Sequence, residues 1–286
     1  MRIILSRKGF DSAYGGYPSP ILPSGEMISL PIPYKEDNIR YSDVKADGSK
    51  TCYDLMKDLK PTIKSADKWP DIDKDTRCHL DPDIYRKAIN RETNWKPCFG
   101  QAGRAQGHLR KQEVREGDFF LYFGWFRKTV YGDDGKLVFD PRERDMHAIF
   151  GYLQIGKIIR VGRGGDVPKW MEYHSHANIK RRNEKANTIY IARDNLSWNE
   201  SLPGAGRFMF NDKLVLTKKG FSKSKWDLPD CFREAEISYH GKSSWKDGYF
   251  QSAAVGQEFV VRDNEEIEEW AKSLIEDRKL NPNNSY

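Results

Sequence analysis

Two apolar runs in the middle of the chain constrain the fold more than any other feature of the sequence. Residues 119–126 read FFLYFGWF and directly follow the turn sequence Glu116-Gly117-Asp118. The second run, residues 147–161, is almost as apolar and is interrupted by Gly156, which is typical of a β-bulge. Runs rich in aromatic and β-branched residues and preceded by turn residues predict long strands of one sheet.

The rest of the chain predicts shorter elements. Further strands are expected at residues 2–5, 137–139, 188–192 and 213–216, and short helices or turns at residues 55–63 and 83–90. Five prolines between residues 11 and 51 favour extended, ordered loops in that segment, because proline is unfavourable inside a helix.

The clearest helix lies near the C-terminus. Asp263 or Asn264 can cap it, and acidic residues fill its first turn, where the helix dipole favours them. Its apolar residues fall on one face: Ile267, Trp270, Ala271, Leu274 and Ile275. These patterns together predict a single α+β unit over residues 1–286. We expect a bent, partly barrel-like antiparallel sheet with long ordered loops and a C-terminal amphipathic helix.

Composition limits the class of protein. The chain of 286 residues is 38% hydrophobic and 13% aromatic, which indicates a folded globule rather than a disordered chain. Its net charge of +6 suits an anionic partner, although many enzymes with neutral substrates are equally basic. No apolar run approaches the ~20 residues of a membrane span, and no signal-peptide pattern opens the chain. We therefore expect a cytoplasmic protein with reduced, mostly buried cysteines.

The first candidate binding residues follow the opening strand. Arg7 and Lys8 precede Gly9, and two cations beside a freely folding amide are suited to binding a phosphate. The alternative is a pair of solvated cations, with Asp11 simply pairing with Arg7. The sequences GxxxxGK[ST] and GxGxxG are both absent, so neither a P-loop nor a dinucleotide fingerprint is expected.

A second candidate segment is residues 99–111, FGQAGRAQGHLRK. Its three glycines let backbone approach a ligand closely, and Gln101 is suited to hydrogen bonding with a base edge. His108 is suited to proton transfer near neutral pH, and so is His147 at the start of the second apolar run. The alternatives are a surface loop without function and a hydrogen-bonded, half-buried His147.

Aromatic residues supply a third candidate. Strand alternation puts Trp125 and Arg127 on one face and Tyr122 and Phe126 on the other. One face must fill the core, whereas the other can stack a base between a ring and Arg127. Gln154 on the later strand is a candidate for orienting a substrate. Core packing alone is the alternative for most of these rings.

Six histidines raise the question of a metal. His174 and His176 alternate, so both rings can share one strand face, and His79 lies in the sequence CHLDPD. A His-x-His pair with a carboxylate from elsewhere can hold a transition metal. However, no HExxH, no cysteine pair and no complete two-histidine, one-carboxylate set occurs in one segment. We therefore expect no metal and no cofactor.

Several of these segments together resemble a known family. SRKGFDS, YGGYPSPI, FGQAGRAQGHL, GDFFLYFGWFR and HAIFGYLQIG, in this order, are similar to the nucleotide modification associated domain 3 family over nearly the whole chain. The resemblance implies a setting among DNA base-modification genes of bacteria and phages, without implying a mechanism or a catalytic set. Residues 116–161 also resemble PUA/EVE-type barrels, which read modified bases in RNA or DNA.

Two functions remain open from the sequence. The first is an enzyme acting on a nucleotide or a DNA base, with Arg7 and Lys8 on phosphate, His108 or His147 in proton transfer, and Gln101 and Gln154 orienting the substrate. The second is a non-catalytic reader of modified bases. Polar residues in glycine-rich loops favour the enzyme, and the barrel-like sheet and basic charge favour the reader. In either case the expected partner is a nucleotide or nucleic acid, preferably DNA, and the oligomeric state is open.

Overall fold

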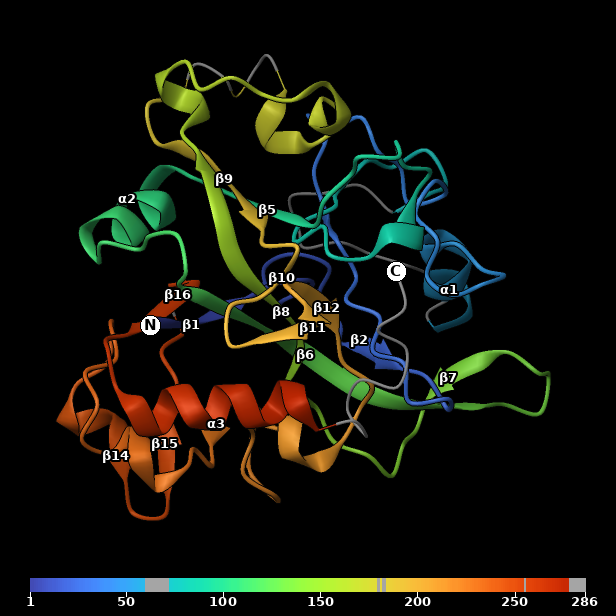
Figure 1. Ribbon diagram of the computed structural model, residues 1–286. Coiled ribbons are helices and arrows are strands. Elements are labelled where there is room, and N and C mark those ends of the chain that lie inside the picture. The colour runs from blue at the N-terminus through green and yellow to red at the C-terminus, as the bar shows by residue number, and fades with distance from the viewer. Residues whose placement is uncertain (60–71, 179–180, 182–183, 255, 278–286) are drawn as a thin grey trace.

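A computed structural model describes residues 1–59, 72–178, 181, 184–254 and 256–277 of the chain (Figure 1). Its α-helices are α1 (Cys52–Leu59), α2 (Gly103–Lys111) and α3 (Glu265–Glu276). Its strands are β1 (Ile3–Arg7), β2 (Ser19–Ile21), β3 (Ile32–Pro33), β4 (Cys78–His79), β5 (Cys98–Ala102), β6 (Phe119–Tyr131), β7 (Leu137–Phe139), β8 (Met146–Ile159), β9 (Asn187–Ala192), β10 (Asn195–Leu196), β11 (Asn199–Pro203), β12 (Ala205–Arg207), β13 (Lys225–Trp226), β14 (Trp245–Lys246), β15 (Tyr249–Gln251) and β16 (Glu258–Val261). Short 3₁₀ helices are η1 (Arg86–Ala88), η2 (Val161–Arg163), η3 (Lys169–Met171), η4 (Ser175–Ala177), η5 (Asp212–Leu214), η6 (Asp230–Phe232) and η7 (Lys242–Ser244).

One large mixed sheet organises the molecule. Its main strand order is β16-β1-β6-β8-β9-β5, with β12 beside β8 and with β2 and β7 beside β6. β6 pairs in parallel with β1 and β2 and antiparallel with β7 and β8. The long segment between β1 and β6 permits this, because parallel neighbours need a long crossover connection. The α+β class is therefore confirmed, with a mixed rather than wholly antiparallel sheet.

The described strands of this sheet do not close into a barrel, because its outer strands β16 and β5 do not pair with each other. The similarity of residues 116–161 to PUA/EVE-type barrels is thus not supported. The predicted bulge is confirmed, since the pairing of β8 with β9 shifts register between Ile155 and Lys157, around Gly156. A second register shift lies between Tyr122 and Phe123 in the pairing of β6 with β8.

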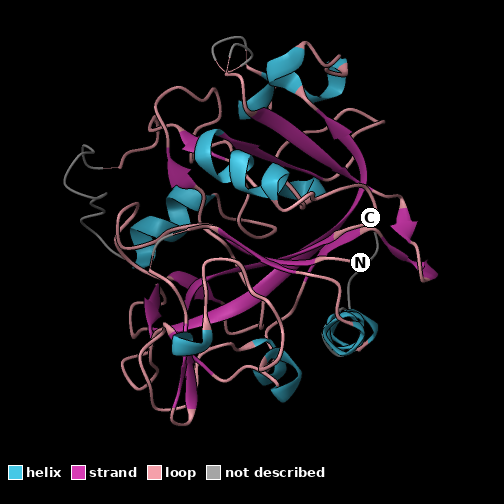
Figure 2. Cartoon of the chain, turned by 90° about the vertical axis from the view of Figure 1, so that its left-hand side faces the viewer, coloured by secondary structure: helices cyan, strands magenta, loops and turns pink. Residues whose placement is uncertain are grey.

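Both faces of the two long strands are buried at their centre. Residues 119–123 of β6 are all 0% exposed, and residues 147–155 of β8 are all buried. Figure 2 shows helices and loops on both sides of the long strands. The main core joins β1, β6, β8, β16 and α3, so neither face of residues 119–123 is left open for a ligand. Among the described residues, no helix is long and apolar enough to cross a membrane.

The local predictions succeeded where the pattern was strong. β7, β9 and α3 are confirmed, and Asn264 caps α3 by accepting a hydrogen bond from the amide of Ile267 at 3.0 Å. The strand predicted at 213–216 is wrong: η5 lies there, because Asn211 accepts the amide of Lys213 and starts a turn instead. The helix predicted at 55–63 is α1, with residues 60–63 outside the described part, and the turn at 83–90 contains η1.

Candidate functional site

A polar cavity of about 540 Å³ opens where β1 and β5 end, beside β3, β4 and η4. It is lined by Arg7, Lys8, Gly9, Asp11, Tyr14, Ile32, Pro33, Tyr34, His79, Asp81, Gly100, Gln101, Ala102, Gly103, His176, Arg181, Glu184, Ala254, Gly256 and Gln257. Its volume lies within the range of small-ligand sites. We call this space the central cavity.

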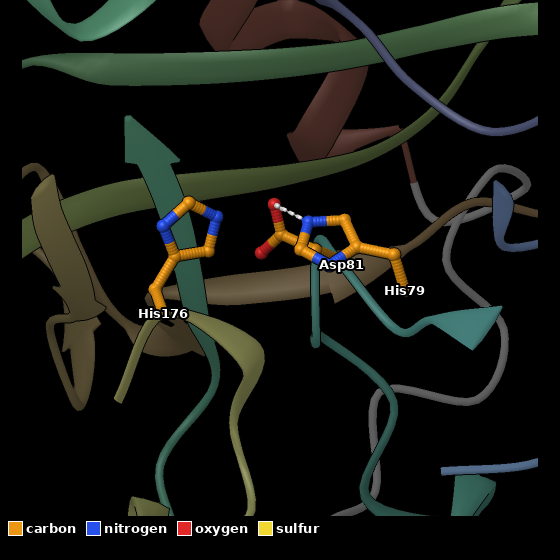
Figure 3. A group of neighbouring side chains, drawn as sticks. All are labelled: His79, Asp81 and His176. Carbon is orange, nitrogen blue, oxygen red and sulfur yellow. Dashed lines mark ion pairs between the residues drawn. The ribbon is translucent and has the colours of Figure 1, made fainter. Parts of the chain in front are cut away.

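Two imidazoles and a carboxylate point toward one another in the central cavity (Figure 3). His79 belongs to β4, Asp81 follows it in the next loop, and His176 comes from η4 much later in the chain. One nitrogen or oxygen atom from each residue lies within 4.8 Å of the other two. His79 Nε2 lies 3.8 Å from Asp81 Oδ2, which is too far for a hydrogen bond. These three side chains, the His-Asp-His cluster, therefore face a shared space instead of satisfying one another.

Gly100 in β5 fixes two members of this cluster. Its amide donates a hydrogen bond of 2.8 Å to Asp81 Oδ1. The ring of His176 packs directly on the glycine, because a Cβ at this position would lie 2.2 Å from His176 Cδ2. A larger residue would displace the ring. The glycine that the sequence analysis assigned to close approach of a ligand thus admits a histidine instead.

The cluster carries a buried negative charge beside a neutral ring. Burial by itself would raise the pKa of Asp81, but its contacts with the neighbouring histidines, with His174 first, lower this pKa to about 2. The side chain is only 4% exposed, and its Oδ1 lies 3.4 Å from His174 Nε2. Burial lowers the pKa of His176 well below its ordinary value, despite the charge of Asp81. At neutral pH the cluster therefore contains an ionised carboxylate and an uncharged His176.

Positive groups surround this anionic centre. The guanidinium of Arg181 donates from Nη1 to His176 Nε2 at 3.1 Å and stacks over the ring of Tyr34 at 4.6 Å. Helix α2 begins at Gly103, and its N-cap Ala102 provides no side-chain hydrogen bond. Because both residues line the central cavity, the positive end of the helix dipole lies at its wall. The cavity is thus suited to an anionic ligand.

Four residues predicted from the sequence line the central cavity: Arg7, Lys8, Asp11 and Gln101. The guanidinium of Arg7 donates to the carbonyls of Ala253 and Ala254 at 2.6 and 3.1 Å. The ammonium of Lys8 forms an ion pair of 2.7 Å with Glu258, whose side chain is 0% exposed. Both cations are therefore engaged by the protein itself, and their role in binding phosphate stays a prediction.

The other two of these four residues also make internal contacts. Gln101 Nε2 donates to Glu258 Oε1 at 2.7 Å, so the same carboxylate holds Lys8 and Gln101. Asp11 Oδ1 accepts the amides of Ala13 and Tyr14, both at 2.7 Å, and thereby stabilises its own turn. These contacts position the cavity wall.

The two histidines predicted to transfer protons do not line the central cavity. His147 is 5% exposed within β8, where its Nδ1 accepts a hydrogen bond of 3.0 Å from Trp226 Nε1. Burial lowers its pKa well below the ordinary value, so this ring is neutral. His108 on α2 lies 2.9 Å from Ser238 Oγ and packs against Tyr239 with ring centres 4.2 Å apart. Partial burial lowers the pKa of His108 as well.

The remaining predicted residues also lie away from this cavity: Trp125, Arg127 and Gln154. Gln154 Nε2 donates to Ser197 Oγ at 2.8 Å, and its Oε1 accepts the amide of Ser197, so Gln154 fastens a loop to β8. The ammonium of Lys223 covers the ring of Trp125 at 3.6 Å. A base stacked on that ring would have to displace the lysine.

The sequence held a partial signal for the cluster. The sequence pairs His176 with His174 and predicts no metal, because no third ligand lies near this pair in the sequence. Folding places His79 and Asp81 beside His176 and leaves His174 behind Asp81. The spacing of His79 and Asp81, two ligand types separated by one residue, was the available clue. No motif in the sequence pointed to Arg181 as a site residue.

A second cavity, of about 280 Å³, lies between α2, β8 and β9. Five exposed cations line it: Arg110, Arg115, Arg160, Arg163 and Lys185. Within the described ranges, none of the five forms an ion pair, and Glu113 is the one acidic residue in the lining. Helix α2 runs from the central cavity, at Gly103, to this basic cleft, at Arg110. The cleft presents unpaired positive charge close to the central cavity.

Comparisons with known proteins complete this description. Neither the curated proteins nor the solved structures contain a match to the chain. The family model described as "Nucleotide modification associated domain 3" matches residues 2–262, nearly the whole chain. The five sequence segments that suggested this family lie inside the matched range. The chain therefore belongs to the nucleotide modification associated domain 3 family.

Proposed function

We propose that this protein is an enzyme that acts on a nucleotide or on a base in DNA, with the His-Asp-His cluster as its reaction centre. The observation that carries the proposal is the ionised, buried Asp81 facing two imidazoles inside an open cavity. Membership of a family associated with nucleotide modification supplies the substrate class.

The cost of burying charge favours catalysis over simple binding. A carboxylate taken out of water is expensive unless hydrogen bonds and charges compensate it. Structural carboxylates such as Asp83 are fully engaged by neighbouring groups, whereas Asp81 Oδ2 lies 3.8 Å from His79 and accepts no hydrogen bond from the described residues. Perturbed titratable groups inside a cavity are typical of catalytic sites. A reader of modified bases needs stacking surfaces and neutral hydrogen bonds instead.

Arg181 is proposed to bind the anionic part of the substrate. Its side chain is 18% exposed and lies at the cavity wall, stacked on Tyr34. We expect Arg181→Gln to weaken binding of a nucleoside monophosphate by about 10-fold to 100-fold, because a charge-assisted hydrogen bond is worth about 1.5–3 kcal/mol. Calorimetric titration measures the affinity. Arg193→Gln, at an exposed arginine outside the central cavity, is the matched control.

Turnover distinguishes the enzyme from the reader. The protein is incubated with nucleotides and with DNA containing ordinary or modified bases, and the products are digested to nucleosides and analysed by mass spectrometry. The appearance of a new nucleoside or the loss of an existing one supports the proposal, provided that the change is slower with Arg181→Gln than with Arg193→Gln. Tight binding of a modified base with no change in any nucleoside would contradict the enzyme and support a non-catalytic reader of modified bases.

The basic cleft favours a DNA strand over a free nucleotide as the substrate. Neutralising three of its arginines together, Arg110→Gln, Arg160→Gln and Arg163→Gln, is expected to weaken DNA binding and to reduce the slope of log affinity against log salt by about 2 to 3. Mononucleotide binding should stay unchanged, because the central cavity is intact. Fluorescence anisotropy at several salt concentrations measures both quantities.

The control for this experiment removes the same charge elsewhere. Lys219, Lys242 and Lys246 are exposed and line neither cavity. Changing all three to glutamine should leave the salt slope within about 1 of the wild type. Equal losses in the two triple variants would show that DNA responds only to net charge, and the cleft would have no specific role.

A further inference from the structure

We propose that His79, Asp81 and His176 bind a divalent first-row transition-metal ion. Such an ion is the cofactor of the reaction centre proposed above. Its part in turnover rests on that proposal, but its binding can be measured without substrate. Three observations carry the inference: the orientation of the two imidazoles, the free oxygen of Asp81, and the outer partners that hold each ligand.

Each imidazole presents a lone pair to the shared space. His79 Nδ1 lies 2.9 Å from Asp37 Oδ2, and a carboxylate only accepts, so Nδ1 carries a proton and, in the neutral ring, the lone pair is on Nε2. The side chain of Asp37 is 5% exposed, which makes it a fixed partner. A carboxylate behind a histidine is the usual outer contact of a metal-ligating imidazole.

The tautomer of His176 follows from Asn187. The amide nitrogen of Asn187 donates to the carbonyls of His176 and Arg181 at 2.8 and 3.1 Å, so its Oδ1 is left as an acceptor. That oxygen lies 2.8 Å from His176 Nδ1, which therefore carries the proton. In the neutral ring the lone pair is then on His176 Nε2.

Asp81 completes the ligand set. Its Oδ1 accepts a hydrogen bond of 2.8 Å from the amide of Gly100 and lies 3.4 Å from His174 Nε2, whereas Oδ2 faces His79 Nε2. His174 Nδ1 accepts the amide of His176, so its proton lies on Nε2, toward Asp81. Two lone pairs and an anionic oxygen, none hydrogen-bonded to another, then surround one point. A cation resolves their mutual repulsion.

The dimensions and donor types select the kind of ion. Metal bonds of about 2.0–2.2 Å put neighbouring ligand atoms about 3.0–3.4 Å apart. Ligand atoms that lie up to 4.8 Å apart therefore have to approach one another by up to about 1.4–1.8 Å. Two imidazoles and one carboxylate suit zinc, iron, cobalt or nickel rather than calcium or magnesium, which prefer oxygen. Three protein ligands leave a coordination position open toward the central cavity, as catalytic metal sites do.

Arg181 competes with a metal ion for the lone pair of His176. Its Nη1 donates to His176 Nε2 at 3.1 Å and so uses the lone pair that the ion needs. A bound cation displaces the guanidinium from His176, and the released arginine remains at the cavity wall beside Tyr34. Removing the arginine should therefore preserve or strengthen metal binding, whereas removing a ligand should abolish it.

The test uses the full chain, freed of any purification tag and stripped with a chelator. Titration with Co²⁺ or Zn²⁺, followed by calorimetry and, for Co²⁺, by visible absorption, is expected to give about one ion per chain. We expect His79→Ala and His176→Ala each to lose at least about 100-fold in affinity. Asp37→Asn, which keeps all three ligands but weakens the partner of His79, should lose about 10-fold to 100-fold.

Two controls keep the outcome interpretable. His108→Ala removes a histidine outside the cluster and should bind like the wild type, and Arg181→Gln should bind at least as tightly. If a ligand variant does not fold, as judged by circular dichroism, the Asp37→Asn and Arg181→Gln titrations still decide. The absence of stoichiometric binding, or equal binding by all variants, overturns the metal site.

Failure of the metal site and failure of the proposed enzyme are distinguishable. Turnover that continues undiminished in excess chelator refutes the ion and leaves the enzyme standing. Stoichiometric, cluster-dependent metal binding without any change in a nucleoside supports the site and refutes the enzyme.

Discussion

Asp83→Asn is expected to lower the free energy of unfolding by about 3–5 kcal/mol, because it leaves a buried arginine without its counter-ion. Asp83 and Arg91 are 0% and 2% exposed in their side chains and form a bidentate ion pair. Tyr173 and Trp95 also donate to the same carboxylate. Asparagine keeps the shape of the side chain but removes the charge and replaces one acceptor oxygen by a donor, so buried donors that faced that oxygen are left unsatisfied.

Urea-induced unfolding at neutral pH measures this loss. The matched control is Arg142→Gln, since Arg142 makes a similar two-pronged contact with Asp140 but is 81% exposed. An exposed pair contributes little, and the control should unfold at the same urea concentration as the wild type. If both variants unfold alike, burial does not strengthen the Asp83 pair in the way we infer.

The same pair also bears on the reaction centre. Asp83 and Cys98 exchange two backbone hydrogen bonds, both of 2.9 Å, at the start of β5. This contact fastens the segment that carries Asp81 to the strand that carries Gly100. Asp83→Asn variants that remain folded at low temperature should therefore still contain the cluster, and activity should be lost only as the protein unfolds.

Asp81→Asn is expected to reduce turnover by about 10²–10⁴-fold, the range for loss of a central acid–base or electrostatic group. Asparagine has the same shape and can still accept the hydrogen bond from Gly100, so the backbone around it should hold. The change removes the carboxylate of the His-Asp-His cluster and with it the negative charge between the two imidazoles. Single-turnover kinetics with a bound nucleotide isolates the chemical step from binding.

The pH dependence of this variant gives an independent check. Asp81 has a pKa of about 2 in the folded protein, below its unfolded value of about 3.9. Its charge therefore stabilises the fold fully above about pH 4, and this contribution is lost as the pH falls toward 2. The wild type should therefore lose more stability than Asp81→Asn between pH 5 and pH 2, which urea-induced unfolding at several pH values measures. Equal losses in the two proteins would mean that the pKa of Asp81 is not lowered.

Predictions from the sequence succeeded where the deciding forces act between near neighbours. The apolar runs that became β6 and β8, the bulge at Gly156 and the helix α3 all follow from local periodicity. The strand expected at residues 213–216 failed for a local reason too, because the cap from Asn211 competes with strand pairing.

The candidate site could be predicted only in part. The sequence predicts binding roles for Arg7, Lys8, Asp11 and Gln101, and all four line the central cavity. It did not predict that Glu258, from the far end of the chain, holds Lys8 and Gln101. It also selected His108 and His147 over His79, since an imidazole in a glycine-rich loop and one in the core look equally available in a sequence.

The sequence by itself determined the positions of the main strands and the last helix, the basic charge and the family of this protein. The strands and the helix depend on residues a few places apart, the charge depends on composition, and the family depends on motifs in their order along the chain. None of them needs a tertiary contact to be recognised. Only the tertiary structure decided which histidines meet a carboxylate, because His79 and His176 approach each other through β4, η4 and the bare backbone of Gly100. The tertiary structure also decided which ring nitrogen carries the proton in each histidine. The hydrogen-bond partners Asp37, Asn187 and Trp226 determine this for His79, His176 and His147, respectively.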